Sequence, residues 1–577
     1  MNRRDRGVVA ALVLVLVAVG LALAVQHVPQ APVAVDATPG LSLPPVAVYR
    51  EGVIGVPESI TPVTARSRAE RLLVGLIFSG LVKLGPGSTY QPDLATSWSM
   101  SDDGRTWTFN LRDDAVWQDG EPVTAGDVVY TIEALKSPDA AGAASGAWAD
   151  VTVTAPDERT VVFTLGTPVA GFLAAATQPL LPAHLLADVP LADLATSDFA
   201  RLPVGSGPFA VSEMDGEHAI LVPASSVLPG IEEPADGASP SPTMDSLATP
   251  QPRPSSSVPT PYLDQVEVRF YPDEAALAGA MEAGEIDGAA GMSTATAAAL
   301  AALPDVERLR YPTTTLSAVL LNVRPNHPEL RDPRSRQALL AAIDRQALVA
   351  GVLGGDAVRA DALIPPGSWA YDAASAGAVA FDRKAAAKLL DDAGWTLKKG
   401  KLYAPKAKDP YRMELLTVPA DANPHLAAIA GQVRDAWTAL GMDVSVLEVP
   451  VADLGTRLRE GDYAASVVDI AQGLEPDLYP LLASSQVRAA GSNLAGYQDQ
   501  SLDTLLEAAR APGAPDVQQA AWKALLAGLA KRQPILPLAW SDEVMVSRGL
   551  DGPGPRLIAR PGDRFWDVLA WRLAADR

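Results

Sequence analysis

The stretch VWQDGEPVTAGDVVYTIEAL, Val116–Leu135, places a tryptophan beside an Asp-Gly pair and ends in an apolar run. Just upstream, Thr106–Leu111 (TWTFNL) alternates apolar and polar side chains, as a half-buried strand does. The Asp-Gly pair supplies a turn that tolerates positive φ. Thr124 and Asp127 stand three residues apart before the apolar run, which is the spacing of a capping box. The stretch therefore predicts strand, turn and capped helix, and nothing in it activates water or a nucleophile.

The composition sets the class of protein. With 577 residues the chain is too long for one core, and about two to four domains are expected. Lys and Arg number 46 and Asp and Glu 68, for a net charge of −22, which argues against nucleic acid or anionic lipid as partner. The chain has no cysteine, which excludes disulfides, thiolate metal sites, cysteine nucleophiles and a lipidated cysteine.

The N-terminus has the pattern of an export signal. Basic residues in MNRRDR precede an apolar run, Gly7–Val25, that is long enough to span a bilayer as a helix. Ala22-Leu23-Ala24 resembles a cleavage site but lies inside the apolar run, which favours an uncleaved signal anchor at 1–25 over a cleaved signal peptide. In both cases the basic end stays inside and the rest is extracytoplasmic, either tethered to the cytoplasmic membrane or, after cleavage, secreted. The Pro- and Ala-rich residues 26–45 are interpreted as a tether.

Most of the remaining chain alternates helix and strand. An apolar stripe from Leu426 to Leu440 stops at Gly441 and is followed by the strand pattern Val444–Val449, and Asp382 opens a second helix that Gly394 closes. This alternation predicts an α/β fold. The segment 223–261 is dense in Pro, Ser and Thr, cannot bury enough surface to order itself, and is predicted to be a disordered insertion.

Signatures of catalysis and of cofactor binding fail on the residues themselves. None of the five histidines has a second ligand at helical or turn spacing, which predicts no zinc site. Neither G-x-S-x-G nor G-x-G-x-x-G occurs, and Gly394–Leu402 (GWTLKKGKL) lacks the spacing and the hydroxyl of a phosphate loop. We therefore expect no enzymatic activity, no cofactor and no metal.

The opening stretch resembles the bacterial extracellular solute-binding proteins of family 5, the oligopeptide, dipeptide and nickel receptors of ABC importers. The resemblance covers about Tyr49 to the C-terminus, and the order of the matching segments is kept. These segments are GVPESITPVTARSRAERLLVGLIFSGL, YQPDLATSWSMSDDGRTWTFNLRDDAVWQDGEPVTAGDV, PVGSGPFAV, PYLDQVEVRFYPDEAALAGAMEAGEIDG, LLNVR, SRQALLAAIDR, AAAKLLDDAGW, NLAGYQDQSLD and PILPLAW.

The resemblance implies an α/β periplasmic-binding-protein type II fold with three lobes, of which two clamp the ligand and one is specific to the family, preceded by the N-terminal transmembrane or signal-anchor helix. The ligand is enclosed between lobes I and III, which close about two chain crossings. The implied boundaries are lobe I at 46–70, 204–315 and 545–577, lobe II at 71–203, and lobe III at 316–544. The opening motif falls in lobe II, away from the ligand, which makes it a fingerprint of the fold.

In peptide-binding relatives, residues between the first turn and the first helix face the ligand, and these positions correspond here to Arg66, Ser67 and Arg68. Two arginines there favour a carboxylate-bearing ligand, because guanidinium pairs bidentately with carboxylate. The alternative is that they are solvated charges near a helix start. Relatives also hold the ligand's free amine with an Asp, and Gln472 stands at that position, so the carboxylate is missing.

Three further residues complete the implied ligand set. Asn493 and Tyr497 match the family's Asn and Tyr near lobe III, and Trp148 could supply an aromatic wall, although each is more often a packing residue. The resemblance implies a receptor, expected to be monomeric, that captures a peptide-like or carboxylate-bearing solute and delivers it to ABC permease subunits. The alternative is a non-transport sensor or surface interaction protein on the same fold, with a pocket that has drifted.

Overall fold

The structure is a computed structural model that describes residues 46–85, 89–141, 148, 150–169, 171–228, 261–487 and 491–574. The expected signal anchor and tether lie outside these residues, as does most of the expected disordered insertion. At the edge of that insertion, Pro223 ends a strand and Ala224–Ser226 form a 3-10 turn, which differs from the disorder expected there. Within the described ranges, no helix combines the length and the apolarity that a membrane crossing requires.

Eleven of the described strands form one mixed sheet in the order β17-β16-β18-β12-β19-β11-β1-β10-β9-β8, with β13 also paired to β19. The pairs β1–β10, β1–β11, β16–β17 and β16–β18 are parallel, and the others are antiparallel. The strands are β1 (Val48–Ile54), β8 (Phe209–Met214), β9 (His218–Pro223), β10 (Gln265–Tyr271), β11 (Gly288–Ala290), β12 (Val306–Leu321), β13 (Ala357–Arg359), β16 (Arg412–Thr417), β17 (Asp443–Glu448), β18 (Ala465–Ala471) and β19 (Leu536–Arg548).

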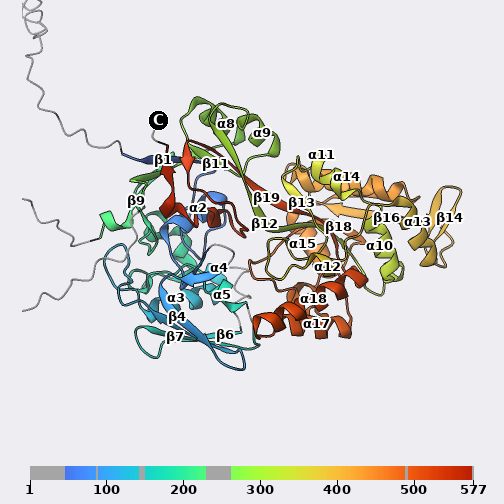
Figure 1. Ribbon diagram of the computed structural model, residues 1–577, viewed down its shortest axis with the longest axis horizontal. Helices are drawn as coiled ribbons and strands as arrows, with labels where there is room; N and C mark the ends of the chain where they lie inside the picture. Colours follow the sequence, from blue (N-terminus) through green and yellow to red (C-terminus); the bar gives the residue numbers. More distant parts are fainter. Residues whose placement is uncertain are drawn as a thin grey trace, which may run out of the picture. The chain divides into compact units, whose positions relative to one another are not determined.

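Two long strands, β12 and β19, connect the two halves of this sheet (Figure 1). They pair antiparallel from Val306↔Arg548 to Val319↔Leu536, and the register shifts between Pro312 and Leu316. Between these two residues β12 is not paired with β19, and Thr314 forms other hydrogen bonds. Its amide donates to the Ile558 carbonyl (3.1 Å), and its hydroxyl donates to the Gln472 carbonyl (2.6 Å). We call this interruption of the ladder the β12/β19 crossing. Strand β12 meets the C-terminal segment and the residues after β18 there.

A separate antiparallel sheet contains the strand that precedes the opening motif. Its order is β4 (Ala95–Met100), β5 (Thr106–Leu111), β7 (Thr160–Leu165) and β6 (Val151–Thr154). Strand β5 buries its alternate side chains, and Gly120 in the turn has φ +94°. Helix α3 (Ala125–Lys136) then starts after Thr124. The predictions of strand, turn and helix start are confirmed.

The motif is held to its surroundings by one buried glutamine. The Gln118 Nε2 donates to the carbonyls of Phe209 (2.8 Å), Gly207 (3.2 Å) and Ile77 (3.3 Å), and its Oε1 accepts from the Gly205 amide (2.7 Å). These bonds join the motif to the end of the first helix and to the start of β8, which is a structural role.

Thr124→Ala is expected to lower the free energy of unfolding by about 0.5–2 kcal/mol, as for other N-cap residues. The amide and hydroxyl of Thr124 both donate to the Asp127 carboxylate, at 2.7 and 3.1 Å, and the substitution removes the hydroxyl contact. Urea unfolding measures the loss, and calorimetry should find ligand affinity unchanged. A tenfold weaker affinity at unchanged stability would contradict this assignment.

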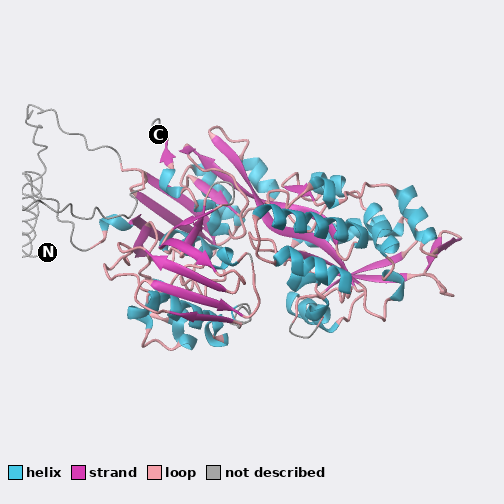
Figure 2. Ribbon diagram, turned by 60° about the horizontal axis from the view of Figure 1, so that its bottom comes forward, coloured by secondary structure: helices cyan, strands magenta, loops and turns pink. Residues whose placement is uncertain are grey.

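Helices lie on both sides of the strands in the β16–β18 part of the large sheet (Figure 2). The predicted helices are present: Asp382 caps α13, and Asn423 caps α14, whose apolar stripe is buried. The helices are α2 (Arg68–Ile77), α3, α4 (Pro138–Ala141), α5 (Phe172–Ala175), α6 (Ala183–Leu186), α7 (Asp198–Arg201), α8 (Glu274–Ala283), α9 (Thr294–Leu300), α10 (Pro333–Ala341), α11 (Arg345–Gly351), α12 (Ala373–Ala376), α13 (Arg383–Asp392), α14 (Pro424–Thr438), α15 (Val451–Glu460), α16 (Tyr479–Leu482), α17 (Gln500–Arg510) and α18 (Pro515–Arg532).

The described residues form three hydrophobic cores. The first draws its buried side chains from Leu316 to Trp540, and the second combines residues before 312 with Met545–Trp571. A small third core packs α8 and α9 on β11 and β19. The second core contains residues of both lobe I and lobe II as they were expected, so these two share one apolar interior. The α/β class is confirmed, and the number of lobes stays a prediction.

Candidate functional site

A cavity of about 310 Å³ lies beside α2, and we call it the α2 pocket. Its wall combines helix α2, strand β2 (Val82–Leu84), the residues directly after β3 (Tyr90–Pro92), the C-terminal segment 556–569 and, from beyond β12, Leu474. The lining residues are Pro62, Ala65, Arg71, Val74, Gly75, Phe78, Ser79, Gly80, Val82, Lys83, Leu84, Asp93, Leu94, Arg112, Asp114, Ala115, Val116, Thr177, Pro179, Ser206, Gly207, Pro208, Leu474, Arg556, Arg560, Gly562, Asp563, Phe565, Trp566, Val568 and Leu569.

Helix α2 presents one face to the pocket. Arg71, Val74, Gly75 and Phe78 line it, and their spacing of three, four and seven residues places them on the same side of a helix. Gly75 has no side chain where the 3-10 turn η7 (Pro561–Phe565) approaches, and a Cβ there would lie 3.2 Å from the Cα of Gly562. The small residue therefore lets η7 pack directly on α2 and form the opposite wall.

Arg556 fixes the C-terminal wall. Its guanidinium donates to the carbonyl of Leu84 (2.6 Å) and lies over the ring of Trp566, 4.6 Å from its centroid. Burial lowers the pKa of Arg556 to about 10, while Asp563 and Asp567 oppose that shift. These contacts hold strand β2 and the segment after residue 556 together across the pocket.

The third wall carries a carboxyl group of altered acidity. Burial raises the pKa of Asp93 above its ordinary value, and the charges of Lys83 and Arg112 and a hydrogen bond from Ser79 oppose that rise. Arg112 pairs with Asp114 at 2.8 Å. The wall is thus polar but largely neutralised by its own pairs.

The lining as described has more basic than acidic side chains, five against three, although the whole chain is strongly acidic. Three of the arginines have partners within the protein, since Arg112 pairs with Asp114, Arg560 pairs with Asp563 (3.4 Å), and Arg556 donates to carbonyls. An anionic group in the pocket would meet a favourable potential.

The residues after β18 reach the pocket from beyond the β12/β19 crossing. Leu474 lines it, and Glu475 accepts a hydrogen bond from the Trp369 indole at 3.0 Å. Burial raises the pKa of the Tyr90 hydroxyl far above its usual value, and the Glu475 carboxylate raises it further. A Cβ added at Gly171 would lie 2.8 Å from the Cβ of Glu475. The loop that follows β18 therefore packs closely on the backbone directly before α5.

The three residues predicted at the start of the first helix have these positions. Arg66 is exposed, donates to the Val63 carbonyl at 2.9 Å, and lines a different cavity of about 450 Å³ with Glu58 and Arg201. Ser67 is the N-cap of α2, with its hydroxyl accepting from the Glu70 amide (3.2 Å). Arg68 forms an ion pair with Glu543 on β19 at 2.5 Å.

The other predicted residues are spread more widely. Gln472 lies at the β12/β19 crossing, where its amide donates to the Thr314 carbonyl (3.1 Å) and its side chain to that of Leu363 (2.9 Å). Asn493 is buried and donates to the carbonyls of Tyr497 (2.8 Å) and Leu482 (3.1 Å).

Tyr497 lies under the guanidinium of Arg336, 5.4 Å from its ring centroid, and Trp148 is half-buried against the second core. The structure therefore brings Asn493 into contact with Tyr497. Gln472 stands two residues before the pocket-lining Leu474 in the chain. The structure places none of the seven predicted residues in the lining of the α2 pocket.

Sequence reasoning missed Arg71, Arg556 and Trp566. Arg71 follows Ser67 by one helical turn, and the apolar periodicity of α2 leaves it outside the buried stripe, which is a signal that was available. Nothing in the sequence brings Arg556 or Trp566 to α2, because that approach depends on the packing of η7.

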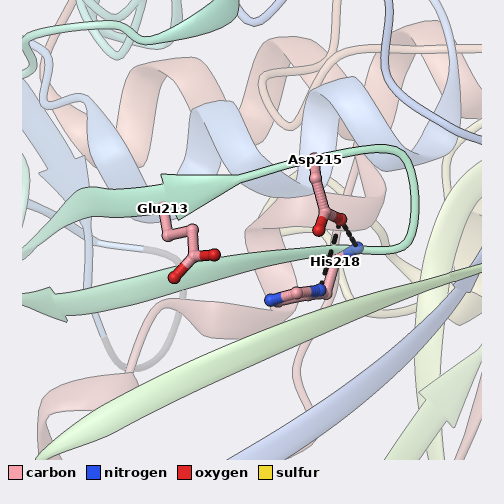
Figure 3. Close-up of side chains that lie close together, drawn as sticks. All are labelled: Glu213, Asp215 and His218. Atoms are coloured by element: carbon pink, nitrogen blue, oxygen red, sulfur yellow. Dashed lines mark hydrogen bonds and ion pairs between the residues drawn. The ribbon is translucent and has the colours of Figure 1, made fainter.

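One surface cluster contains potential metal ligands. Glu213, Asp215 and His218, on the β8–β9 hairpin, offer ligand atoms that lie within 4.8 Å of one another (Figure 3). Sequence reasoning overlooked the turn spacing between Asp215 and His218. Asp215 already accepts from the amides of Glu217 (2.7 Å) and His218 (2.9 Å), and these bonds lower its pKa. The cluster is solvent-accessible, and its hydrogen bonds are those of a tight turn.

Comparison with known proteins places most of the chain in one family. Residues 89–490 match the family model described as bacterial extracellular solute-binding proteins, family 5 Middle. The oligopeptide-binding protein AppA of Bacillus subtilis is 25% identical over 532 residues, which cover 91% of each chain. The probable D,D-dipeptide-binding periplasmic protein DdpA of Escherichia coli is 29% identical over 438 residues, which cover 74% of each.

Solved structures share the fold. The ABC transporter substrate binding protein CtaP of Listeria monocytogenes superposes with a TM-score of 0.71 at 23% identity, over 92% of this chain and 99% of that one. This likeness agrees with the expected class of fold, a mixed α/β architecture of the periplasmic-binding-protein kind.

Proposed function

The chain belongs to the bacterial extracellular solute-binding proteins of family 5, and from this premise we propose that it is the extracytoplasmic receptor of an ABC importer. It captures a peptide-like or other small organic solute and presents it to permease subunits in the membrane, as a monomer. The α2 pocket carries this proposal, because it is a concave site that combines apolar walls with charged side chains and receives Leu474 from beyond β12. Members of this family capture solutes, which is a role in binding and not in catalysis.

Solute capture is proposed to involve closure about the β12/β19 crossing. The register shift between Pro312 and Leu316 interrupts the ladder there, and residues on either side belong to different hydrophobic cores. A few residues that leave a regular ladder can absorb the backbone rotation of a hinge. On this proposal, residues 316–544 form the lobe that moves against 46–315 and 545–577.

The names of the relatives favour the receptor over a sensor or surface interaction protein. AppA and DdpA are both named as binding proteins for peptides, and CtaP as a transporter substrate binding protein. Mass spectrometry of molecules released by denaturing the purified full-length protein tests the proposal. One small organic solute at near-stoichiometric amount supports it, and stable capture of a protein partner with no such solute would favour the sensor.

N-acylated peptides and other organic acids are predicted to bind more tightly than matched free-amine peptides, by about ten- to hundredfold. The reason is that the pocket lining has an excess of basic groups, which favours a carboxylate over a free ammonium group. Calorimetric titration of matched ligand pairs measures the preference. Equal or tighter binding of the free-amine peptides would overturn this prediction.

A further inference from the structure

Arg71 differs from the other arginines of the α2 pocket. The guanidinium groups of Arg112, Arg556 and Arg560 each contact a carboxylate or carbonyl of the protein. The Arg71 side chain, by contrast, makes no hydrogen bond or ion pair with any residue that the structure describes, and it is exposed while lining the cavity. A guanidinium has five donors in a planar fork that matches a carboxylate. Arg71 is therefore able to bind an anion without breaking an existing pair.

The surroundings of Arg71 define what accompanies the anion. Along the same face of α2 come Val74 and Phe78, and from η7 and beyond come Phe565, Val568 and Leu569. These side chains line the same cavity as the guanidinium and give it apolar walls. The cavity of about 310 Å³ is at the lower end of the roughly 300–1,000 Å³ found for small-molecule sites. Such a space suits a compact molecule and is short for an extended oligopeptide.

We infer that the α2 pocket takes a small solute with one carboxylate and an apolar body, and that Arg71, rather than Arg66 or Arg68, pairs with the carboxylate. The inference rests on the proposed function and names the substrate class of that site. Arg68 is already paired with Glu543, and Arg66 lines the other cavity, so neither side chain is placed to reach this solute. A carboxylate needs one bidentate partner, which Arg71 supplies.

The test uses the full chain and matched probes. N-acetyl derivatives of alanine, leucine and phenylalanine are titrated beside the corresponding N-acetyl amides, which keep the shape and remove the charge. The unmodified protein should bind the acids about ten- to hundredfold more tightly than the amides, the range expected for a charge-assisted hydrogen bond. The leucine and phenylalanine compounds should bind more tightly than the alanine compound because the walls are apolar.

Three variants identify the residue. Arg71→Met should remove the preference for acid over amide, and the unfolding midpoint should stay unchanged, since the side chain is exposed. Arg66→Met should keep the preference. Arg434→Met is a matched control, because Arg434 is also an exposed arginine on a helix, α14, and does not line the pocket. Loss of the preference in Arg66→Met, or its retention in Arg71→Met, would overturn the inference.

The outcomes separate this inference from the proposed function. Tight binding of an extended oligopeptide together with no binding of any acid at millimolar concentration would reject the small-acid class and leave the receptor function standing. If a co-purified solute binds the unmodified protein and Arg71→Met with equal affinity, the assigned role of Arg71 is rejected, and the receptor function still stands. Absence of binding by any acid, amide or peptide, and of any co-purified solute, would count against both.

Discussion

Glu51→Gln is expected to lower the free energy of unfolding by about 3–5 kcal/mol, because it breaks a buried ion pair and leaves its partner charged. Glu51 on β1 and Arg564 in η7 are 0% and 1% exposed. The Arg564 guanidinium donates to both carboxylate oxygens of Glu51, and the Tyr49 hydroxyl donates to one of them. Burial and the Glu51 charge raise the pKa of Tyr49 well above its usual value, so the phenol stays a donor.

This pair matters to the pocket as well as to stability. Residues 51 and 564 are 513 positions apart, and their bond holds η7 against the first strand. Since η7 forms the wall opposite α2, the substitution should also weaken solute binding in whatever fraction remains folded. Urea unfolding at fixed pH gives the stability change, and calorimetry gives the affinity.

A double variant provides the control. Glu51→Leu combined with Arg564→Met removes both charges, and replacing a buried pair by apolar groups is often neutral or stabilising. The double variant should therefore recover much of the stability lost by Glu51→Gln. If Glu51→Gln costs under about 1 kcal/mol, which is the range of an exposed pair, the pair is not the constraint described here.

Trp117→Ala is expected to cost about 3–5 kcal/mol, the range for removing a large buried aromatic side chain. Trp117, in the opening motif, is 0% exposed, and its indole donates to Asp127 at 3.4 Å. Its loss leaves a cavity between the turn of the motif and helix α3. If the motif is a structural element, the melting temperature should fall while the affinity of the folded protein stays within a few-fold of the original.

Trp98→Ala supplies a matched comparison for Trp117→Ala. Trp98 lies on β4 and is only half-buried, so its removal exposes less apolar surface and should cost clearly less. Similar losses for the two variants would show that burial of Trp117 is not what makes the motif necessary. A large loss of affinity at an unchanged melting temperature would instead assign the motif to the binding site.

The sequence by itself determined the local elements. Strand β5, the turn at Gly120 and the start of α3 at Thr124 lie where alternation, Asp-Gly chemistry and the capping-box spacing predicted them. The same holds for α13 after Asp382 and for the apolar stripe of α14. These features depend on residues within a few positions of one another, and side-chain periodicity and backbone φ preferences specify them directly.

The sequence predicts the candidate site only in part. The residues Arg66–Arg68 and Gln472 were singled out by resemblance. They lie at the start of α2 and two residues before Leu474, and none of them lines the α2 pocket. Ser67 was predicted from the resemblance to contact the ligand, and in the structure its hydroxyl caps helix α2, which is a role that serine often has before a helix.

Only the tertiary structure decided which side chains meet. The pairing of Arg68 with Glu543, of Glu51 with Arg564, and the closure of the pocket by η7 and Leu474 join residues hundreds of positions apart. Their charges are ordinary in an acidic chain, and no spacing rule connects them. Such contacts are set by the way the sheet and its covering helices pack, since packing fixes the distances between segments that local sequence patterns leave free.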